Sequence, residues 1–386
     1  MGQPVIFIST CEFSGDMHGE VLVRELRRQL PEAEFYGVGG PRMAAAGVEL
    51  LYDPTRVSTI GFLEALRNLG RMKKLAAVIT AAWQQRRPDL MIWLDSGGFN
   101  LVLAKAAQER QIPVYCMFSP SAWAYGEDRA VKLAERVKLL LAVLPFEADF
   151  YRQFGAAVRY VGHPLLDRVH NDQEPEAVRA ALRMAGAQKL VVLMPGSRRQ
   201  EIAKLLRLML AAATEVAQTQ PVRFALPVAA SLDRQGLEAI VGEFPVECSL
   251  FEAGVYNLLA AADAAVIASG TATLEAAILN TPLIVVYRIS KLSYRIYKMM
   301  ESPAHKGQEL MVGLPNLIMG RRIVPELLQE NLNAANIARE LQKMLGDAEY
   351  NARLRRELQT VRERIGPPGV MQRAAELIAA ECQPKH

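Results

Sequence analysis

Short apolar runs of five or six residues alternate with longer amphipathic stretches along most of the chain. Each run is bounded by glycine, proline or polar residues, which is typical of strands buried in a parallel sheet. The stretches between them, such as His18–Leu30, have the apolar spacing of helices. This alternation indicates an α/β fold. The predicted strands are Val5–Ser9, Glu34–Val38, Leu90–Leu94, Val114–Phe118, Leu139–Leu144, Leu190–Met194, Val222–Leu226, Val246–Phe251, Ala264–Ala268 and Leu283–Tyr287.

The predicted strands fall into two series, which are separated by the polar stretch Asp167–Pro175. A chain of 386 residues is longer than one hydrophobic core usually supports, so two domains are expected. We expect one domain at residues 1–168 and a second at residues 169–365. The charge-rich region from Val324 onward is predicted to be helical. We expect its last helix, within residues 366–386, to pack back on the first domain.

The clearest strand-to-helix junction is Ser269-Gly270-Thr271, which lies between the strand Ala264–Ala268 and a helix predicted from Thr271. In an open α/β sheet, ligands bind at the carboxyl ends of the strands, and the N–H groups of a following helix favour phosphate. Glu275 lies in the first turn of that helix, where its carboxylate could accept two ribose hydroxyls. Taken alone, a simple capping turn with a dipole-complementing acid explains the junction better.

Polar groups also follow strands in the first half of the chain. The loop after the first strand carries Glu12, Ser14, Asp16 and His18, and Asp95 directly follows Leu94 at the end of another strand. An acid at a strand's carboxyl end is a stronger functional indication than an acid on a helix face. These side chains are expected to line one cleft. The alternatives are that Asp16 caps its own helix and that Asp95 caps the loop after it.

In the second half, Gly196, Ser197 and Arg198 lie between a strand and a helix. A glycine turn, a hydroxyl and a guanidinium suit a diphosphate. The spacing is not that of a Walker loop, and no G-x-G-x-x-G fingerprint follows a strand, so kinase and nicotinamide functions lose their main support. Acids in the first half and phosphate-binding loops in the second indicate a nucleotide-sugar enzyme that works across an interdomain cleft.

Composition narrows the classes further. Hydrophobic residues at 51% and charged residues at 22% are typical of a globular protein, and a net charge of +4 is too small for a dedicated nucleic-acid binder. Four cysteines are far apart and form no C-x-x-C pair, which favours buried thiols in a reducing compartment and no metal site. The first strand begins so close to Met1 that we expect no signal peptide. These features predict a cytoplasmic protein without a cofactor.

The motifs together resemble those of the lipid-A-disaccharide synthases, a family of glycosyltransferases with two Rossmann-like domains (the GT-B type). The resemblance covers nearly the whole chain, and the order and spacing of the motifs make it specific. The motifs are Glu12-x-Ser14-Gly15-Asp16-x-His18-Gly19, Gly37-Val38-Gly39-Gly40-Pro41-Arg42-Met43, Gly61-Phe62-x-Glu64, Phe99-Asn100, Leu144-Pro145-Phe146-Glu147, Gly162-His163-Pro164, Pro195-Gly196-Ser197-Arg198, Ser269-Gly270-Thr271-Ala272-Thr273-Leu274-Glu275, Gly313-Leu314-Pro315-Asn316 and Val324-Pro325-Glu326-Leu327-Leu328-Gln329.

The resemblance implies a reaction that joins UDP-2,3-diacylglucosamine to 2,3-diacylglucosamine 1-phosphate, with inversion, to give a β-1,6-linked lipid A disaccharide phosphate and UDP. Asp95 then corresponds to the family's essential acid and is the predicted general base, with His18 as its rival. The acceptor side is implied to comprise Glu12, Ser14, Asp16 and His18. The UDP side is implied to comprise Gly196, Ser197, Arg198, Ser269, Gly270, Thr271, Glu275 and Asn316.

Three positions depart from the family's usual pattern. Cys11 replaces a glycine, Gly97 replaces a proline, and Tyr125 replaces the second tryptophan of an aromatic loop. These departures leave the shape of the cleft and the acyl preference open.

An acylated substrate has to be taken from a bilayer surface, so peripheral association with the inner membrane is expected. The candidate membrane-facing residues are Phe62, Leu66, Leu69 and Met72, which recur at helical spacing among basic residues. The alternative is that this stripe, which continues to Trp83, packs on the sheet. The oligomeric state stays open, with a homodimer among the options.

Two other functions also remain open. A UDP-N-acetylglucosamine 2-epimerase would share the fold and the nucleotide-binding half, although it acts on a soluble sugar. A catalytically silent binding protein is the second alternative, but such a protein should have lost Asp95 or the Arg198 loop, and both are present.

Overall fold

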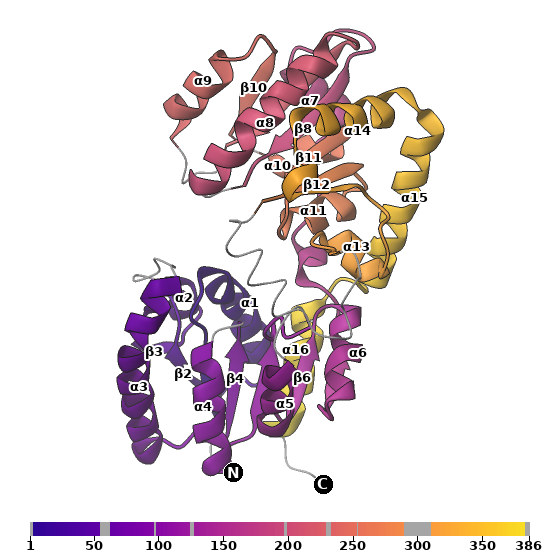
Figure 1. Cartoon of the computed structure of the whole chain (residues 1–386). Coiled ribbons are helices and arrows are strands. Elements are labelled where there is room, and N and C mark those ends of the chain that lie inside the picture. The colour runs from indigo at the N-terminus through magenta and orange to yellow at the C-terminus, as the bar shows by residue number, and fades with distance from the viewer. Residues whose placement is uncertain are drawn as a thin grey trace. The chain divides into compact units, whose positions relative to one another are not determined.

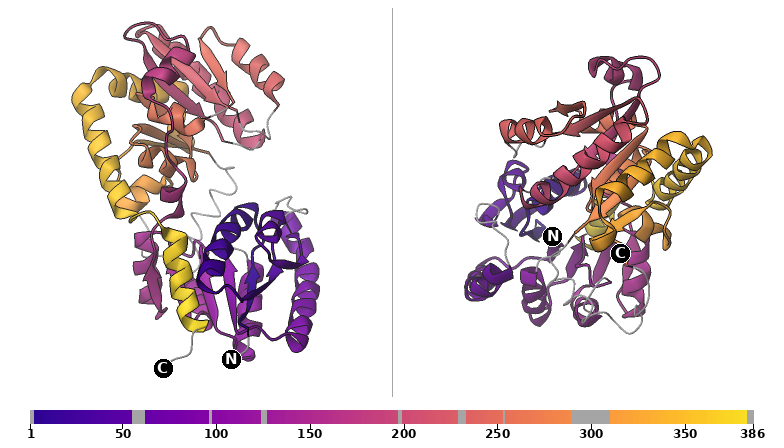
Figure 2. Two further views of the ribbon diagram at one scale, coloured as in Figure 1. Left: turned by 180° about the vertical axis from the view of Figure 1, so that it is seen from behind. Right: turned by 45° about the horizontal axis from the view of Figure 1, so that its top comes forward.

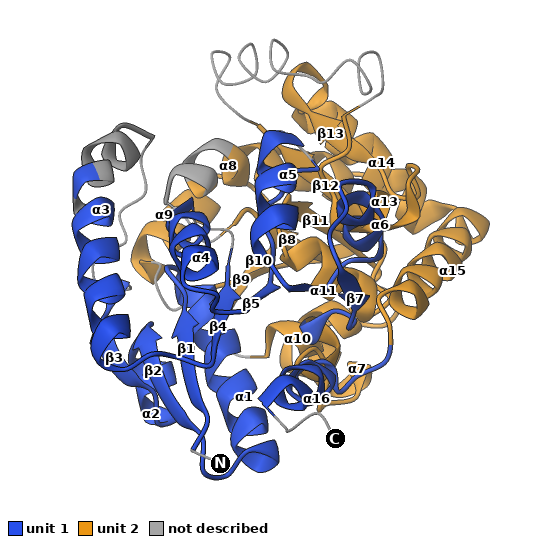
Figure 3. Ribbon diagram, turned by 90° about the horizontal axis from the view of Figure 1, so that it is seen from below, with its two compact units in different colours: residues 1–164, 367–386 blue, residues 165–366 orange. Residues whose placement is uncertain are grey.

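The computed structural model describes residues 3–54, 62–95, 98–123, 127–196, 199–228, 233–252, 254–288 and 310–382. The chain forms two compact units, coloured separately in Figure 3. Unit 1 comprises residues 1–164 together with 367–386, and unit 2 comprises residues 165–366. No helix in the described ranges is long and apolar enough to cross a bilayer.

Unit 1 is built on a parallel sheet whose seven strands have the order β3-β2-β1-β4-β5-β6-β7. The innermost strands are apolar on both faces, as expected for a sheet covered by helices on both sides. All five residues of β4 are buried, for example. The strands are β1 (Val5–Ser9), β2 (Glu34–Val38), β3 (Glu49–Tyr52), β4 (Leu90–Leu94), β5 (Val114–Met117), β6 (Leu139–Ala142) and β7 (Val158–Tyr160).

Helices cover both faces of this sheet. Figure 1 shows α3, α4 and α5 in front of it, and the view from behind in Figure 2 shows α16 beside α1. Arg373 of α16 donates from Nη2 to the carbonyl of Val161 at 2.8 Å. This hydrogen bond joins the last helix to the residue that follows β7. The helices are α1 (Phe13–Gln29), α2 (Pro41–Ala45), α3 (Phe62–Gln85), α4 (Gly98–Glu109), α5 (Glu127–Arg136), α6 (Pro145–Gln153) and α16 (Val370–Cys382).

Unit 2 repeats the same plan with a six-stranded parallel sheet in the order β10-β9-β8-β11-β12-β13. Its strands are β8 (Lys189–Met194), β9 (Val222–Pro227), β10 (Cys248–Phe251), β11 (Ala264–Ala268), β12 (Leu283–Tyr287) and β13 (Glu326–Leu328). Its helices are η2 (Pro164–Asp167), α7 (Pro175–Ala181), α8 (Arg199–Ala217), α9 (Arg234–Gly242), α10 (Val255–Ala260), α11 (Ala272–Ile278), α13 (Leu314–Met319), η4 (Gln329–Asn331), α14 (Ala334–Gly346) and α15 (Ala348–Arg364).

In both units the strand order reverses beside the first strand, which is the Rossmann arrangement. The reversal lies between β1 and β4 in unit 1 and between β8 and β11 in unit 2. Crossover connections leave a crevice at this switch point, outside the carboxyl ends of the strands. Residues that follow these four strands are therefore the first to consider as functional.

The ten predicted strands are confirmed, with ends shifted by up to two residues. Three strands were missed, namely β3, β7 and β13, which are short or only partly buried. The region after Val324 was predicted to be helical; α14, α15 and α16 are, whereas Glu326–Leu328 is a strand that pairs with β12. A three-residue edge strand is too short to show a periodic pattern.

Candidate functional site

The switch point of unit 1 is organised around the carboxylate of Asp95, which is only 4% exposed. Its Oδ2 accepts a hydrogen bond from Thr10 Oγ1 at 2.7 Å and others from the backbone N–H groups of Cys11 and Glu12. Its Oδ1 accepts from Asn100 Nδ2 at 3.0 Å. Asp95 therefore joins the end of β4 to the loop that starts α1, and α4 supports it from the other side.

The carboxyl ends of β4 and β5 both carry a strained backbone. Leu94 pairs with Met117 in the sheet, and the residues that follow them, Asp95 and Phe118, have φ angles of 109° and 61°. Positive φ costs a non-glycine residue about 1–2 kcal/mol, and such residues cluster at functional sites. Two such residues at neighbouring strand ends indicate a functional site at this edge of the sheet.

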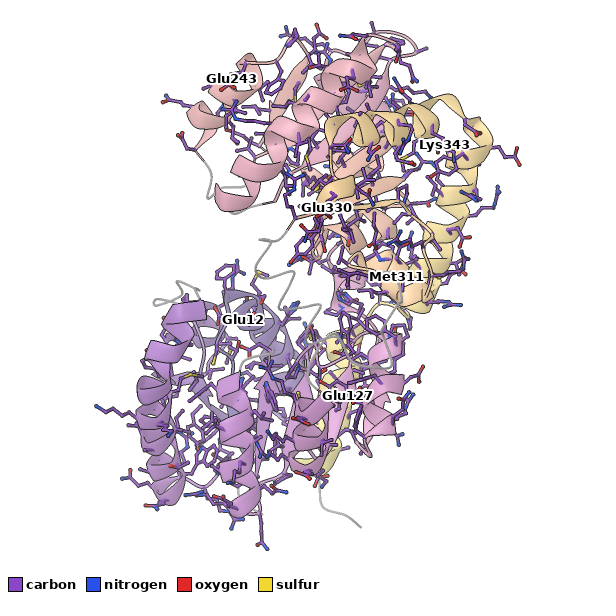
Figure 4. All side chains as sticks on the ribbon, in the orientation of Figure 1. Glu12, Glu127, Glu243, Met311, Glu330 and Lys343 are labelled. Carbon is purple, nitrogen blue, oxygen red and sulfur yellow. The ribbon has the colours of Figure 1, made fainter. Side chains whose placement is uncertain are left out.

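The four residues predicted for the acceptor side have different surroundings. Glu12, labelled in Figure 4, is half-buried at the start of α1, and Ser14 is exposed in the first turn. The imidazole of His18 stacks on the ring of Phe118, with centroids 4.3 Å apart and planes at 21°.

Asp16 is fully buried. Its carboxylate accepts from the backbone N–H groups of Gly40 at 2.8 Å, Arg42 at 3.1 Å and Met43 at 3.0 Å. Asp16 thus caps the start of α2, and not its own helix. Asp16 therefore holds the start of α2 against α1.

A second buried carboxyl in unit 1 belongs to Glu147 of α6, which contacts the segment that follows β5. It is 4% exposed, and its Oε1 accepts from Ser119 Oγ at 2.7 Å. Burial raises the pKa of Glu147 from 4.5 to about 7, and the Ser119 hydroxyl and the nearby backbone N–H groups of Val143 and Leu144 offset part of that rise. Glu147 belongs to the motif Leu144-Pro145-Phe146-Glu147, but the motif by itself indicates no role for its carboxyl.

The switch point of unit 2 holds a cavity of about 580 Å³. Pro195 and Gly196 line it after β8, and Ser269, Gly270 and Thr271 line it after β11. A cavity of this volume is large enough for a nucleotide. Of the residues predicted to bind UDP, Ser197 and Arg198 lie outside the described residues.

Glu275, also predicted, lines the same cavity from α11. Its Oε1 accepts from Arg168 Nη2 at 3.3 Å and from Tyr256 Oη at 3.4 Å. Burial raises the pKa of Glu275, while the Arg168 guanidinium and the two hydrogen bonds act in the opposite direction. A carboxylate held in this way presents a fixed acceptor to a hydroxyl in the cavity.

Asn316 does not line the cavity. It is fully buried; its Nδ2 donates to the carbonyl of Val324 at 3.0 Å and to Glu326 Oε1 at 2.7 Å. Glu326 in turn accepts from the backbone N–H groups of Val312 and Gly313, both at 2.9 Å. Because Ser269 Oγ donates to the carbonyl of Val312 at 2.8 Å, this network supports the loop after β11 from behind.

Of the four candidate membrane-facing residues, the side chains of Phe62, Leu66 and Leu69 lie outside the described ones. Met72 is half-buried and packs against the core of unit 1. Farther along α3, Trp83 is 2% exposed, and its ring meets that of Phe7 edge-on, with the ring centroids 5.2 Å apart. For this second half of the stripe, packing on the sheet is the observed arrangement.

Several residues at both sites escaped the sequence analysis. Thr10 directly follows the first strand, so the same rule that selected Asp95 could have found it. Arg168 and Tyr256 contact Glu275 from 107 and 19 residues away, and no local pattern indicates either contact. In the described part of the chain, no group of three or more histidine, cysteine, aspartate or glutamate residues could hold a metal ion.

Comparisons with known proteins agree on one family. The profile of the family Lipid-A-disaccharide synthetase matches residues 6–379. The chain is 38% identical over 380 residues to the Lipid-A-disaccharide synthase of Syntrophus aciditrophicus, covering 97% of each chain. It is 37% identical over 376 residues to that of Myxococcus xanthus, again covering 97% of each.

Solved structures show the fold in more distant proteins. A putative UDP-N-acetylglucosamine 2-epimerase from Listeria monocytogenes aligns with a TM-score of 0.66 at 12% identity, covering 100% of this chain and 98% of that one. MurG of Acinetobacter baumannii aligns with a TM-score of 0.64 at 12% identity, covering 98% and 99%. At such identities the likeness extends to the fold alone.

Proposed function

This chain belongs to the lipid-A-disaccharide synthase family and is a glycosyltransferase; from that premise we propose how its two units divide the reaction. The sugar of UDP-2,3-diacylglucosamine is transferred to the 6-hydroxyl of 2,3-diacylglucosamine 1-phosphate. The bond from the anomeric carbon to the diphosphate breaks, a β-1,6 bond forms with inversion, and UDP leaves. Unit 1 receives the acceptor and unit 2 holds UDP.

The observation that carries this proposal is the agreement between the family match and the chemistry of the two switch points. The match covers residues 6–379, and so includes both sheets. Unit 2 has a nucleotide-sized cavity that Glu275 helps to line, and unit 1 has a buried acid at a strained strand end. One half is thus suited to hold a leaving group and the other to activate a hydroxyl.

In unit 2 we assign the diphosphate to the two loops that line the cavity. Gly196, at φ 106°, brings the backbone after β8 close to the ligand without a side chain in the way. Gly270 does the same after β11, and Thr271 beside it adds a hydroxyl. By the family resemblance, Ser197 and Arg198 also belong to this subsite. Glu275 accepts the ribose hydroxyls.

In unit 1 we assign the general base to Asp95. Inversion requires in-line attack, so the acceptor hydroxyl must lose its proton as the new bond forms. A carboxylate fixed by Thr10, Asn100 and the backbone needs no rearrangement to act, which is the condition for efficient proton transfer.

Glu12, Ser14 and His18 surround the position of the acceptor, and Asp16 supports them through the start of α2. Asn316 has the corresponding supporting task in unit 2, where it acts through Glu326 and the backbone at Val312.

Peripheral binding to the inner membrane is part of the proposal, because both substrates carry acyl chains. Phe62, Leu66 and Leu69 at the start of α3 are the apolar candidates, and the exposed Lys73 and Lys74 would face anionic headgroups. With Met72 packed on the core, the apolar candidates are confined to the part of α3 that precedes it. A homodimer is compatible with the proposal but not required by it.

The decisive experiment incubates the protein with both acylated sugars and follows UDP release and disaccharide formation. UDP should appear in equal amount with the disaccharide, and only when the acceptor is present. As a matched control, UDP-N-acetylglucosamine replaces the acylated donor and should give no 2-epimer. Epimer formation, or binding of UDP without any turnover, would favour one of the two alternative functions.

A further inference from the structure

Helix α6 contributes no residue to the candidate site, yet two of its side chains hold the segment that follows β5. Glu147 accepts from Ser119 Oγ at 2.7 Å, and Tyr151 Oη donates to the carbonyl of Pro120 at 2.6 Å. Glu147 is 4% exposed, Ser119 is 7% exposed and Tyr151 is fully buried. Residues 119 and 120 are therefore fixed from inside the unit.

The residue before this attachment has a strained backbone. Phe118 has φ of 61°, a left-handed backbone that costs a bulky residue about 1–2 kcal/mol. Such a conformation persists only where the surroundings impose it. Two hydrogen bonds to the next two residues, together with the pairing of β5, are the constraints that do so here.

The left-handed turn directs the ring of Phe118 across the strand ends to α1. There it stacks on His18, with the ring centroids 4.3 Å apart. The imidazole is half-buried, and the Phe118 ring is stacked on it. A contact chain thus runs from Glu147 through Ser119 and Phe118 to His18.

We propose that Glu147 and Ser119 are positioning residues, which hold Phe118 in its left-handed conformation and thereby fix the imidazole of His18 for the acceptor. This inference rests on the proposed function, in which His18 belongs to the acceptor side. Glu147 then acts through two intermediates and does not touch a substrate.

The competing explanation is that Glu147 only caps α6, since it lies in the first turn of that helix. The backbone N–H groups of Val143 and Leu144, which lower the pKa of this carboxyl, fit such a cap. A cap does not explain the hydrogen bond from Ser119, which lies in another segment. Glu147 Oε2 is buried without a hydrogen-bonding partner among the described residues, which is costly for the fold. The Ser119 hydroxyl is the side-chain partner that this carboxyl holds.

The first test reads the His18–Phe118 stack without using activity. Histidine side chains are labelled at Cε1 with ¹³C, and the signal of His18 among the five histidines is assigned with His18→Gln. Stacking on an aromatic ring displaces this signal upfield. We expect Ser119→Ala to abolish the displacement and the exposed neighbour variant Ser121→Ala to preserve it. An unchanged His18 signal in folded Ser119→Ala would overturn the proposal.

The second test is a double-mutant cycle on the acceptor KM. Ser119→Ala should raise this KM about three- to ten-fold, the size of one lost hydrogen bond, and leave UDP affinity unchanged. In the His18→Gln background the same change should add nothing, because Ser119 acts through His18. Glu147→Gln, whose amide oxygen can still accept a hydrogen bond from Ser119, should raise the acceptor KM less than Glu147→Ala does.

Equal effects of Ser119→Ala in both backgrounds would refute the positioning role while the reaction itself stands. If the wild-type protein forms no disaccharide, the proposed function fails, and the signal of His18 still decides whether Ser119 positions it. Should Glu147→Ala not fold, Ser119→Ala and Glu147→Gln carry the test.

Discussion

The partners of the Asp95 carboxylate come from two segments, the loop that follows β1 and the start of α4. Its carboxylate holds the first residues after β1, 84 residues earlier, as well as Asn100 in α4. The sequence had offered a choice between a base and a cap of the following loop. The structure adds a third task, because Asp95 also fixes the start of α1.

We expect Asp95→Asn to reduce turnover by about 10²–10⁴-fold, since an amide cannot take the acceptor's proton. UDP affinity should persist, because the cavity lies in unit 2. The variant should also melt at a lower temperature, since its NH₂ group would face donors that now meet a carboxylate oxygen, at a cost of about 1–3 kcal/mol. Single-turnover UDP release, calorimetric UDP titration and thermal melting measure the three effects.

Thr10→Val is the matched control, because it removes one hydrogen bond to Asp95 and leaves the carboxylate in place. It should keep turnover within about ten-fold of wild type. If Thr10→Val loses as much as Asp95→Asn, the loop attachment explains the effect. Near-normal turnover in Asp95→Asn, together with inactive His18→Gln, would move the base to His18.

Glu147 should make the stability of the protein depend on pH. Burial raises its pKa from 4.5 to about 7, so the folded state binds a proton that the unfolded state has already released between those values. The stability contributed by the protonated form is complete below pH 4.5 and is lost as the pH rises through 7. The buried groups that face Glu147 are Ser119, Cys116 of β5 and Tyr151 of its own helix.

Glu147→Gln removes this titration, so it should gain stability over wild type as the pH increases, by up to about 3 kcal/mol at pH 8. The measurement compares urea unfolding of the two proteins at pH 5 and pH 8. A difference between them that stays constant with pH would mean that Glu147 does not titrate in this range.

Among the elements, α3 packs the described part of its apolar stripe on the core of unit 1. Ile79 is fully buried and Trp83 nearly so, whereas Met72 and Leu75 pack at the edge of the same core. Lys73 and Lys74 are exposed between them. Periodicity alone cannot distinguish a membrane-facing stripe from a sheet-facing one, because both have the same spacing.

We expect Lys73→Gln combined with Lys74→Gln to weaken binding to phosphatidylserine vesicles about 30-fold, at about 1 kcal/mol for each basic residue near the surface. The melting temperature should not change, since both side chains are exposed. Vesicle co-sedimentation at low and high salt measures the effect. The control is Arg356→Gln with Arg362→Gln on α15, which removes the same charge from exposed positions of unit 2. An equal loss in the control would mean that the effect reflects net charge and not the position of Lys73 and Lys74.

For the whole molecule, the decisive feature is that unit 1 is not a continuous piece of the chain. Helix α16 follows unit 2 in sequence and packs on α1, and its Glu381 accepts from Tyr115 Oη of β5 at 3.1 Å. Ala374, Ala375 and Ile378 of this helix are buried. The end of the chain therefore stabilises the unit to which the beginning belongs.

Ile378→Ala should destabilise unit 1 by about 2–5 kcal/mol, because it leaves a cavity under a fully buried side chain. Hydrogen exchange should increase in unit 1, and UDP affinity should stay unchanged. Gln372→Ala, on the exposed face of the same helix, is the control. Destabilisation confined to unit 2 would contradict the described packing.

Transfer should proceed without a divalent metal. The sequence has no D-x-D pair after a strand in its second half, and Arg198 and Arg199 are available to neutralise the leaving diphosphate. Excess EDTA should leave the rate intact, whereas loss of turnover that magnesium restores would show that the assignment is wrong. Arg198→Ala should reduce the rate more than Arg199→Ala, because only Arg198 matches the family's position.

The sequence by itself determined the strands and the residues at their ends. A buried parallel strand is a local apolar run, so β1, β2, β4, β11 and β12 were predicted with the ends they have in the structure. Asp95 follows β4 directly, Gly196 lies in the loop after β8, and Glu275 lies in the first turn of the helix after β11. These positions are also local properties of the sequence. The family was recognisable because its motifs lie at these junctions.

Only the tertiary structure decided what those residues contact. It joined Asp95 to Cys11 and Glu12, Glu275 to Arg168, and Asn316 to Glu326. It also brought Phe118 onto His18 and α16 onto α1. A pattern of hydrophobic and polar positions records which way a side chain faces within its own element. It does not record which distant element lies opposite, because the packing of the whole unit sets that.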